Sequence, residues 1–539
     1  MSSINNSETF YDAIVIGAGF SGIQQLHFLR DKLGLNTLLL EAGEAVGGTW
    51  YWNRYPGARC DSESHTYCFY FSEQILKEWS WSQKYPGQEE ILSYLNFVTD
   101  KLELRPNILF RTRVAEMNYF QSQNRWVVKS TKGEKFSARY VISAVGCLSS
   151  ANSPNIKGRD NFQGELYHTG QWPHEKVDFK NKKVAVIGTG SSGIQAVPII
   201  AKSAKELTVF QRTPNFSVPA RNADLSHEFL SQFKSKTSYY REKMKAARHG
   251  HPWQAPDISV RETLSIEREE ILEAAWRKGG LRFRESFGDT LTDLESNKLM
   301  SDFIKRKILE IVKDPNKAKI LSNFDHPFGT KRPALDTDYF ETFNKKNVNL
   351  IDIRQDPIQE ITNVGLETES QKFDFDMIIF ATGFDALTGS LLKMEIIGEG
   401  GRRLADDWKD GPRTYLGLQV ARFPNFFIVT GPGSPSVLTN MPQAIDQNVS
   451  WITDCISYMK ENNFSKIEPK KEFMSDWMEQ VQKAVEGTLF PIAKHSWYLG
   501  ANIPGKPQVF MPYVGGLNQY RKICDDVAAT GYNGFQFST

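Results

Sequence analysis

Residues 11–41 read YDAIVIGAGFSGIQQLHFLRDKLGLNTLLLE. An apolar run typical of a buried strand leads into the turn Gly17-Ala-Gly19-Phe-Ser-Gly22 and then into a stretch with helical spacing of its apolar residues. A second apolar run follows and ends in Glu41. This order of strand, glycine turn, helix, strand and acid predicts a dinucleotide-binding fold.

The chemistry of the ligand explains the pattern. Glycines allow the backbone to approach a pyrophosphate at the N-terminus of the helix, where free N–H groups and the helix dipole favour an anion. An acid at the tip of the second strand accepts hydrogen bonds from ribose hydroxyls, which suits FAD. The residues expected to contact FAD in this unit are Gly17, Gly19, Phe20, Ser21, Gly22 and Glu41.

The pattern occurs a second time, with a different ending. An apolar run at 183–187 enters Gly188-Thr-Gly190-Ser-Ser-Gly193, and the next strand, 206–210, continues into Gln-Arg212-Thr213 instead of an acid. An acid at this position would repel a 2′-phosphate, whereas a guanidinium and a hydroxyl would hold one, so this unit suits NADPH. The expected NADP contacts are Gly188, Thr189, Gly190, Ser191, Ser192, Gly193, Arg212 and Thr213.

Two further strands that end in glycine, at 140–146 and 377–383, bracket the second unit. They predict an α/β protein with two Rossmann-like domains, in which the FAD domain is discontinuous. We expect the FAD domain at 1–147 and 385–539, the NADP domain at 148–223 and 328–384, and a helical insertion at 224–327. The sequence leaves open whether this insertion only packs on a neighbour or also walls a substrate cavity.

Composition excludes several other classes of protein. The 539 residues carry a net charge of only +2, which provides no basic field for nucleic acid. The five cysteines are scattered without a CxxC pair, which argues against a disulfide framework, a structural metal site and a redox dithiol. The N-terminus is short and polar, and no apolar run is long enough to span a bilayer. We therefore expect a cytoplasmic protein, a monomer or weak oligomer that acts on a small molecule.

The segment between the two nucleotide units carries a further motif. Residues 162–173 read FQGELYHTGQWP, and the stretch resembles the FxGxxxHxxxW[P/D] fingerprint of the type I Baeyer–Villiger monooxygenases. Its fingerprint residues are Phe162, Gly164, His168 and Trp172. Flavin-containing monooxygenases that oxidise nitrogen or sulfur have a similar linker with Phe or Tyr at the position of Trp172. The resemblance is therefore specific to the Baeyer–Villiger enzymes.

The resemblance extends over nearly the whole chain, to the cyclohexanone and phenylacetone types of the family. The similar segments are GGTWYWNRYPGARCD at 47–61, FQRTP at 210–214, KRP at 331–333, FATGFDA at 380–386, GPGSPSVLTNMP at 431–442 and SWYLGANIPGK at 496–506. It implies two dinucleotide-binding domains with a helical insertion. It also implies NADPH- and O2-dependent insertion of one oxygen next to the carbonyl of a cyclic, linear or aryl ketone through a C4a-peroxyflavin, with sulfoxidation as a side activity.

The resemblance also assigns roles to individual residues. Arg332 would stabilise the flavin peroxide and the adduct formed from it, next to both cofactors, and Asp61 would hold the guanidinium in place beside the flavin. Lys331 would join Arg212 and Thr213 at the 2′-phosphate, and Trp497 would close over the nicotinamide nucleotide. Gly48, Thr49 and Trp50 would lie against the flavin ring, while Ser436, Leu438 and Met441 are candidates for the substrate pocket.

The histidine of the fingerprint, His168, has two interpretations. It could be a general base, but its place between the domains favours a hinge or anchoring role.

Two other functions compete with a ketone monooxygenase. One is a flavin-containing monooxygenase that oxidises only nitrogen or sulfur atoms, and the other is a non-catalytic flavoprotein that serves as a redox sensor. Ester formation from a simple ketone, with one NADPH consumed per product, separates a ketone monooxygenase from the heteroatom monooxygenase. Purified protein without yellow colour, or without oxygen uptake in the presence of NADPH, would favour the sensor.

Overall fold

The apolar run at the start of the sequence forms the centre of an eight-stranded sheet. In the computed structural model, which describes residues 10–539, β1 (Phe10–Ile16) lies parallel between β2 (Thr37–Leu40) and β6 (Lys135–Ser143). The sheet order is β17-β4-β5-β6-β1-β2-β3, and β18 also pairs with β6. The other strands are β3 (Ile108–Leu109), β4 (Val114–Phe120), β5 (Arg125–Ser130), β17 (Glu395–Ile397) and β18 (Phe426–Ile428).

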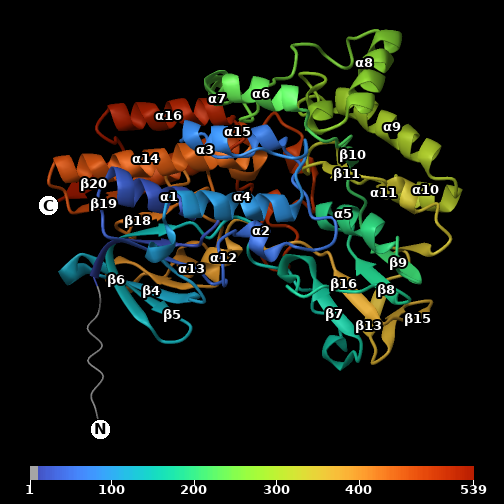
Figure 1. Cartoon of the computed structure of the whole chain (residues 1–539), viewed down its shortest axis with the longest axis horizontal. Coiled ribbons are helices and arrows are strands. Elements are labelled where there is room, and N and C mark those ends of the chain that lie inside the picture. The colour runs from blue at the N-terminus through green and yellow to red at the C-terminus, as the bar shows by residue number, and fades with distance from the viewer. Residues whose placement is uncertain (1–9) are drawn as a thin grey trace.

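This first sheet is assembled from two distant parts of the chain. Strands β17 and β18 follow the second nucleotide unit in sequence and pair in parallel with β4 and β6. The limits 1–147 and 385–539 stay predictions. Helices cover one face of the sheet, above it in Figure 1: α1 (Phe20–His27), α4 (Gln88–Lys101), α14 (Met441–Glu461), α15 (Lys471–Val485) and α16 (Leu517–Ala529).

Helix α1 is held to the second part of the chain by side-chain hydrogen bonds. Gln24 Nε2 donates to Asp446 Oδ1 at 2.7 Å, and Gln25 Nε2 donates to Thr453 Oγ1 at 3.2 Å. The helix continues past His27 as a π-helical turn over Phe28–Lys32, where the sequence pattern predicts an ordinary α-helix. The helix that starts at the first glycine turn is thus fixed by α14.

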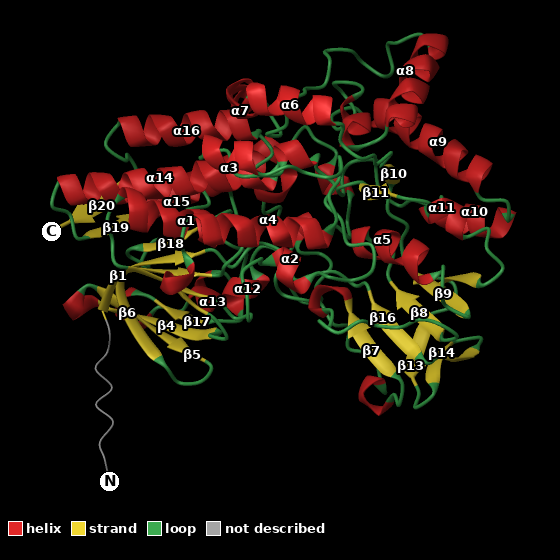
Figure 2. Ribbon diagram, viewed as in Figure 1, coloured by secondary structure: helices red, strands yellow, loops and turns green. Residues whose placement is uncertain are grey.

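The second nucleotide unit forms a separate sheet, at the lower right of Figures 1 and 2. Its five strands are all parallel, in the order β12-β9-β8-β16-β7. They are β7 (Glu165–His168), β8 (Lys183–Ile187), β9 (Glu206–Gln211), β12 (Val348–Asp352) and β16 (Met377–Phe380), and α5 (Ser191–Ile200) follows β8. A three-stranded antiparallel sheet adjoins them: β13 (Ile358–Ile361), β14 (Gly365–Thr368) and β15 (Lys372–Asp374).

A helical insertion interrupts this second unit between β9 and β12. The chain leaves through β10 (Ser217–Pro219) and returns through β11 (Ala334–Asp336), and these two short strands pair in parallel as a neck. The helices of the insertion are α6 (His227–Ser235), α7 (Thr237–Ala246), α8 (Ser265–Lys278), α9 (Leu294–Ile311) and α10 (Pro315–Leu321). Arg332 lies just before β11, so the neck fixes where its side chain starts.

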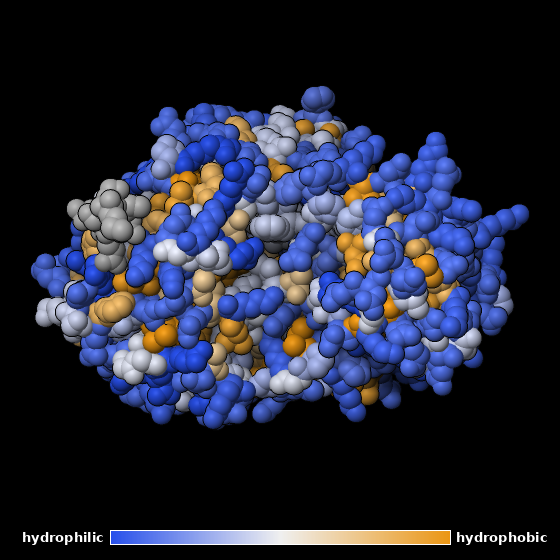
Figure 3. All heavy atoms as spheres, turned by 90° about the horizontal axis from the view of Figure 1, so that it is seen from below, coloured by the Kyte–Doolittle hydropathy of each residue, from blue (hydrophilic) through white to orange (hydrophobic). Residues whose placement is uncertain are grey.

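Shorter elements complete the structure. They are α2 (Thr49–Trp52), α3 (Glu73–Glu78), α11 (Tyr339–Thr342), α12 (Gly389–Leu392), α13 (Leu404–Asp407), β19 (Lys466–Pro469) and β20 (Phe535–Ser538). No helix within 10–539 has the length and apolar character to cross a bilayer. Seen from below, hydrophobic side chains emerge in small groups among hydrophilic ones (Figure 3).

All five cysteines are buried and unpaired. In the described part of the chain, no group of three or more His, Cys, Asp or Glu side chains is arranged to hold a metal ion.

The insertion meets the first domain at three histidines, of which His65 and His251 are buried and His249 is half-buried. The ring of His65 makes edge contacts with Phe229 and Tyr240, at centroid distances of 5.2 and 5.4 Å. Burial lowers the pKa of His65 to about 4, against the opposing effect of Glu63. Burial likewise lowers the pKa of His249 to about 4 and brings that of His251 well below its usual value. The folded protein therefore keeps these histidines neutral at pH values where the unfolded chain binds protons.

We predict that the protein loses stability as the pH falls from about 7.5 to about 5. In the unfolded chain a histidine titrates near 6.5, so below that pH the unfolded state binds more protons, and the free energy of unfolding decreases until the lowered folded pKa is reached. Thermal melts across this range measure the effect.

His65→Phe keeps the aromatic contacts and removes one titrating group, so its melting temperature should depend less on pH. His495→Asn, at an exposed position, is the matched control. Equal pH dependence in His65→Phe and the parent protein would contradict the prediction.

Candidate active site

The first glycine turn is packed tightly against backbone atoms of the turn itself and of the segment after β6, on one side only. A Cβ on Gly22 would lie 1.8 Å from Gly17 O, and a Cβ on Gly17 would lie 2.6 Å from Ala144 O. A Cβ on Gly19 would meet only Gly48, at 3.4 Å. No side chain caps α1, which leaves N–H groups at its start for an anion. The turn therefore fits a pyrophosphate.

The acid at the end of β2 is fixed beside this turn. Glu41 is buried, and its carboxylate accepts hydrogen bonds from Ala18 N at 2.7 Å and Gly43 N at 2.6 Å. Burial raises the pKa of Glu41, and the backbone hydrogen bonds oppose that rise. The carboxylate is oriented, with acceptor capacity left for ribose hydroxyls.

The loop at 47–61 stacks directly on the glycine turn. Gly48 has φ +52°, and a Cβ there would lie 2.8 Å from Gly19 Cα. This contact places α2 beside the phosphate turn. Trp50 is buried and its Nε1 donates to Tyr67 Oη at 3.3 Å, with the two rings edge to face. Tyr51 instead packs against His174, with ring centroids 4.7 Å apart.

The second half of the loop docks on the other nucleotide unit. Tyr55 Oη donates to Gln195 Oε1 of α5 at 2.8 Å, and Gln195 Nε2 donates back to Arg59 O at 3.1 Å. Gly57, at φ +82°, approaches the same turn of α5 so closely that a Cβ would lie 2.5 Å from Gln195 O. Asp61 is thus presented at the junction of the two nucleotide units.

At this junction Asp61 meets Arg332 in a two-point ion pair. Arg332 Nε donates to Asp61 Oδ2 at 2.6 Å and Nη2 donates to Asp61 Oδ1 at 2.9 Å, although the residues are 271 apart in sequence. Arg332 Nη1 also donates to Val437 O at 3.2 Å. Burial alone would lower the pKa of Arg332, but the charge and hydrogen bonds of Asp61 outweigh it and raise the pKa.

The pair leaves Arg332 with spare donors. A guanidinium has five N–H groups, and three of them are used by Asp61 and Val437. Within 10–539 the other two have no acceptor, so they are available to a bound ligand. A fixed, permanently charged donor with free N–H groups can stabilise negative charge on a reacting oxygen atom.

The second glycine turn repeats the construction of the first. A Cβ on Gly193 would lie 2.3 Å from Gly188 O, and a Cβ on Gly188 would lie 2.4 Å from Ala381 O. Gly190 has no atom within 4 Å of its Cβ position. Thr189 Oγ1 donates to Thr213 O at 3.0 Å, which joins the turn to the end of β9. This turn also fits a pyrophosphate.

The end of β9 carries the polar groups expected for a 2′-phosphate. Arg212 is exposed and Lys331 is half-buried. Burial lowers the pKa of Lys331, Asp325 opposes that change, and the nearby charge of Arg212 adds to it. An acid that the motifs did not indicate also lies here: Thr213 Oγ1 donates to Asp325 Oδ2 at 3.3 Å. The structure thus brings Arg212, Thr213 and Lys331 together, with Asp325 among them.

Comparisons with known proteins agree with this layout. Residues 14–261 match the family model described as pyridine nucleotide-disulphide oxidoreductase. The chain is 42% identical to cyclohexanone 1,2-monooxygenase of an Acinetobacter species, over 97% of this chain and 96% of the relative. It is 40% identical to a Baeyer-Villiger monooxygenase of Pseudooceanicola batsensis, over 97% and 95%. The chain belongs to the Baeyer–Villiger monooxygenase family.

A solved structure supports the same assignment. The crystal structure of OTEMO complexed with FAD and NADP superimposes with a TM-score of 0.94 at 41% identity, covering 98% of this chain and 99% of that chain. The enzyme therefore has the family's complete two-domain arrangement.

The fingerprint of this Baeyer–Villiger monooxygenase lies where the chain crosses between domains. His168 is buried at the end of β7, where its Nδ1 accepts from Gly170 N at 2.9 Å and its Nε2 lies 3.2 Å from Asn152 O. Thr382 Oγ1 also donates to Asn152 O, at 2.6 Å. Asn152 and Thr382 belong to the outgoing and returning crossings, so His168 ties the two together.

The other fingerprint residues pack locally. A Cβ on Gly164 would lie 2.5 Å from Asp376 O, so a residue with a side chain does not fit at this position. Phe162 and Trp172 are buried, and Trp172 packs on Tyr167 with centroids 5.1 Å apart.

The substrate-pocket candidates lie in the same segment as Val437, whose carbonyl accepts from Arg332. Ser436 and Leu438 flank Val437 in a short turn, and Met441 begins α14. Asn440, the residue before Met441, donates from its backbone N–H to His249 O of the insertion at 2.9 Å. The insertion therefore contacts the segment that carries the substrate-pocket candidates.

Trp497 packs against the hydrophobic cluster that also contains Val437 and Leu438. Its ring centroid lies 4.4 Å from that of the buried Tyr498. Burial raises the pKa of Tyr498, while the nearby charge of Arg332 acts in the opposite direction. Sequence motifs missed both Tyr498 and the Val437 carbonyl, because a backbone acceptor and a buried tyrosine carry no distinctive pattern.

The two glycines of the second turn provide a prediction with an internal control. Gly193→Ala should destabilise the fold by about 1–3 kcal/mol, because its Cβ has no room beside Gly188 O. Gly190→Ala should leave the melting temperature nearly unchanged and weaken NADPH binding, because its Cβ fills the open side of the turn. Thermal melts and NADPH titration measure the two effects. Tight NADPH binding by Gly190→Ala would place the pyrophosphate elsewhere.

Proposed function

We propose that this protein is an FAD- and NADPH-dependent monooxygenase that uses O2 to insert one oxygen atom next to a ketone carbonyl and releases an ester or lactone. The observation that carries the proposal is the two-point pair of Arg332 and Asp61 at the junction of two nucleotide-binding units. A reductase or sensor has no need for a fixed cation with free donors at that junction, whereas oxygen transfer to a carbonyl does.

Two groups of residues would hold the cofactors. FAD would lie on the turn at 17–22 and against Glu41, with Gly48, Thr49 and Trp50 beside its ring. NADPH would lie on the turn at 188–193, with its 2′-phosphate near Arg212, Thr213 and Lys331. Bound FAD, once reduced by NADPH, supplies the activation of O2.

Arg332 carries the central catalytic role. Its two free N–H groups would stabilise the negative charge that develops on the reacting oxygen atoms, while Asp61 keeps the guanidinium from rotating away. The guanidinium stays protonated throughout, so it acts as an electrostatic group and not as a proton donor. Asp61 is a positioning residue that acts through Arg332.

The surrounding side chains would exclude water and shape the substrate pocket. Ser436, Leu438 and Met441 would line it, with the insertion behind Asn440. Trp497 would cover the nicotinamide nucleotide. Apolar pockets discriminate weakly between similar molecules, so cyclic, linear and aryl ketones are all expected as substrates, with sulfides as a secondary class.

His168 would couple the domains and not transfer a proton. Both of its ring nitrogens are engaged by backbone groups of the crossings, and burial lowers its pKa, so it is neutral at physiological pH. This arrangement suits an anchor that holds the two crossings at a fixed separation.

Replacing the central cation provides the main test of the mechanism. Arg332→Ala should lower the rate of ester formation by about 100- to 1000-fold, because the developing charge loses its stabilising donors. Anaerobic reduction of the flavin by NADPH should continue, and stopped-flow absorbance separates the two steps.

Arg402→Ala removes a comparable two-point pair with Asp407 on the surface and is the matched control. Ester formation by Arg332→Ala at the parent rate would rule out the assigned role.

A substrate panel tests the reaction class. With NADPH and O2, the purified enzyme should convert simple ketones to esters or lactones and consume one NADPH per product. Oxidation of amines and sulfides without any ester would instead identify a heteroatom monooxygenase. Protein that carries no flavin, or that consumes no oxygen with NADPH, would favour a non-catalytic role.

A further inference from the structure

The cation cluster at the end of β9 contains an acid that its expected function does not explain. Asp325 follows α10 at the end of the insertion, 112 residues after Thr213 in sequence, yet Thr213 Oγ1 donates to its Oδ2 at 3.3 Å. Its charge also acts on Lys331 and on Arg354 of the neighbouring segment. A carboxylate thus contacts the hydroxyl, and lies close to the lysine, that are expected to bind the 2′-phosphate.

Asp325 stays ionised in this setting. The hydrogen bond from His326, assisted by the charge of Lys331 and the hydroxyl of Thr213, lowers the pKa of Asp325 to about 2. The ring of His326 is buried, with its Nδ1 2.9 Å from Asp325 Oδ1, and burial lowers the pKa of His326. At neutral pH the histidine is therefore an uncharged donor that orients the carboxylate without cancelling its charge.

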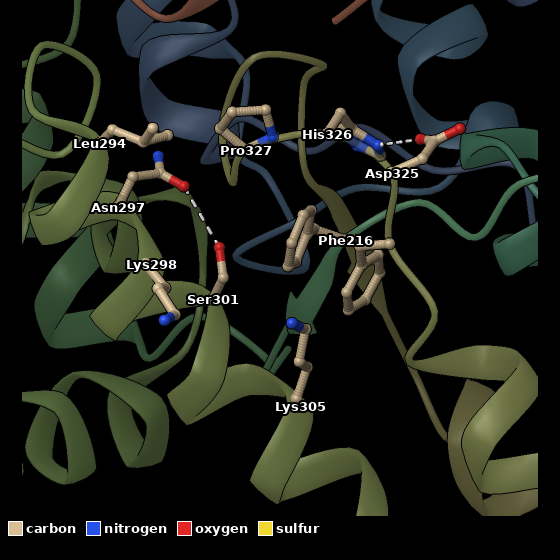
Figure 4. A pocket seen from close by; sticks show the side chains of 10 residues that line it. Phe216, Leu294, Asn297, Lys298, Ser301, Lys305, Asp325, His326 and Pro327 are labelled. Carbon is tan, nitrogen blue, oxygen red and sulfur yellow. Dashed lines mark hydrogen bonds and ion pairs between the residues drawn. The ribbon is translucent and has the colours of Figure 1, made fainter. Parts of the chain in front are cut away.

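Asp325 is exposed, but the residues next to it are packed. It borders a cavity of about 220 Å³ that is lined by Phe216, Phe324 and residues of α9, among them Lys298 and Lys305. Phe216 and Phe324 stack with centroids 3.6 Å apart. In Figure 4 the carboxylate of Asp325 extends away from both lysines, on the far side of His326. Its neighbours in the phosphate cluster are therefore Thr213 and Lys331.

We propose that Asp325 is a specificity-determining residue that competes with the 2′-phosphate of NADPH for Thr213 and Lys331. The proposal rests on the NADPH site described under Proposed function. By itself, the set of Arg212, Thr213 and Lys331 would favour NADPH strongly over NADH, because only NADPH carries a 2′-phosphate that can pair with the two cations.

Asp325 reduces that preference in two ways. Its negative charge repels the phosphate, and the phosphate must displace it from the Thr213 hydroxyl before binding there. NADH carries no 2′-phosphate, so neither cost applies to it. An acid at the end of β9 itself would exclude NADPH. Asp325 instead comes from another segment, and it only reduces the preference for NADPH over NADH.

Direct binding to the FAD-loaded enzyme tests the proposal. The probes are 2′,5′-ADP, which carries the 2′-phosphate, and 5′-AMP, which lacks it, titrated by calorimetry into the parent protein and Asp325→Asn. We expect Asp325→Asn to bind 2′,5′-ADP about 10-fold more tightly, equivalent to about 1.4 kcal/mol, and 5′-AMP with less than about twofold change. The KM for NADPH should fall while that for NADH does not.

Two further variants complete the experiment. Asp178→Asn removes the same charge before β8, at the opposite end of the sheet from the glycine turn, and should leave both affinities unchanged. Asp325→Ser, which is smaller and uncharged, replaces Asp325→Asn if melting curves show that the asparagine variant is not folded.

The outcomes separate the two levels of inference. Unchanged or weaker binding of 2′,5′-ADP by the folded Asp325 variant would overturn the role of Asp325, with the NADPH site intact. Failure of the parent enzyme to bind 2′,5′-ADP at all would instead overturn the NADPH site, and this inference with it.

Discussion

The ion pair between Arg332 and Asp61 is the contact on which the rest of the site depends. A guanidinium removed from water is costly unless a carboxylate holds it, and a two-point pair holds it in one orientation. The two residues of the pair come from different parts of the chain. Asp61 belongs to the loop that stacks on the first glycine turn, and Arg332 lies at the neck of the insertion. Both nucleotide units and the insertion must therefore be in place before the cation is positioned.

The contacts around the pair show how that requirement is met. Gly48 packs on Gly19, which links the loop to the first turn, and Tyr55 binds Gln195 of α5, which links it to the second. The carbonyl of Val437 takes a third N–H of Arg332. Because each unit contributes one restraint, movement of either domain would change the position of the Arg332 guanidinium. This arrangement suits an enzyme that must use two cofactors in sequence at one place.

Much of this architecture could be predicted from the sequence because it depends on local patterns. Glycine spacing after an apolar run identifies both phosphate turns, and the contrast between Glu41 and Arg212 separates the two cofactors. The fold class and the family followed from such segments, and the comparisons confirm them. Other features could not be predicted, because they arise from contacts between distant segments. Trp50 and Tyr51 are neighbours in sequence, yet one packs within the first domain and the other on His174.

The acid at Asp325 illustrates the same limit. Nothing in its sequence neighbourhood marks it as a cofactor residue, and only the folded chain places it against Thr213. The π-helical turn at 28–32 could likewise not be predicted, because the spacing of apolar residues does not distinguish it from an α-helix.

The most direct test of the central claim is a double-mutant cycle on the ion pair, measured as the rate of ester formation for Asp61→Asn, Arg332→Lys and the combined variant. If Asp61 acts only by holding Arg332, the combined variant loses about as much rate as Arg332→Lys alone. If the loss in the combined variant, expressed as activation free energy, equals the sum of the losses in the two single variants, the two residues act independently. That result would contradict the account.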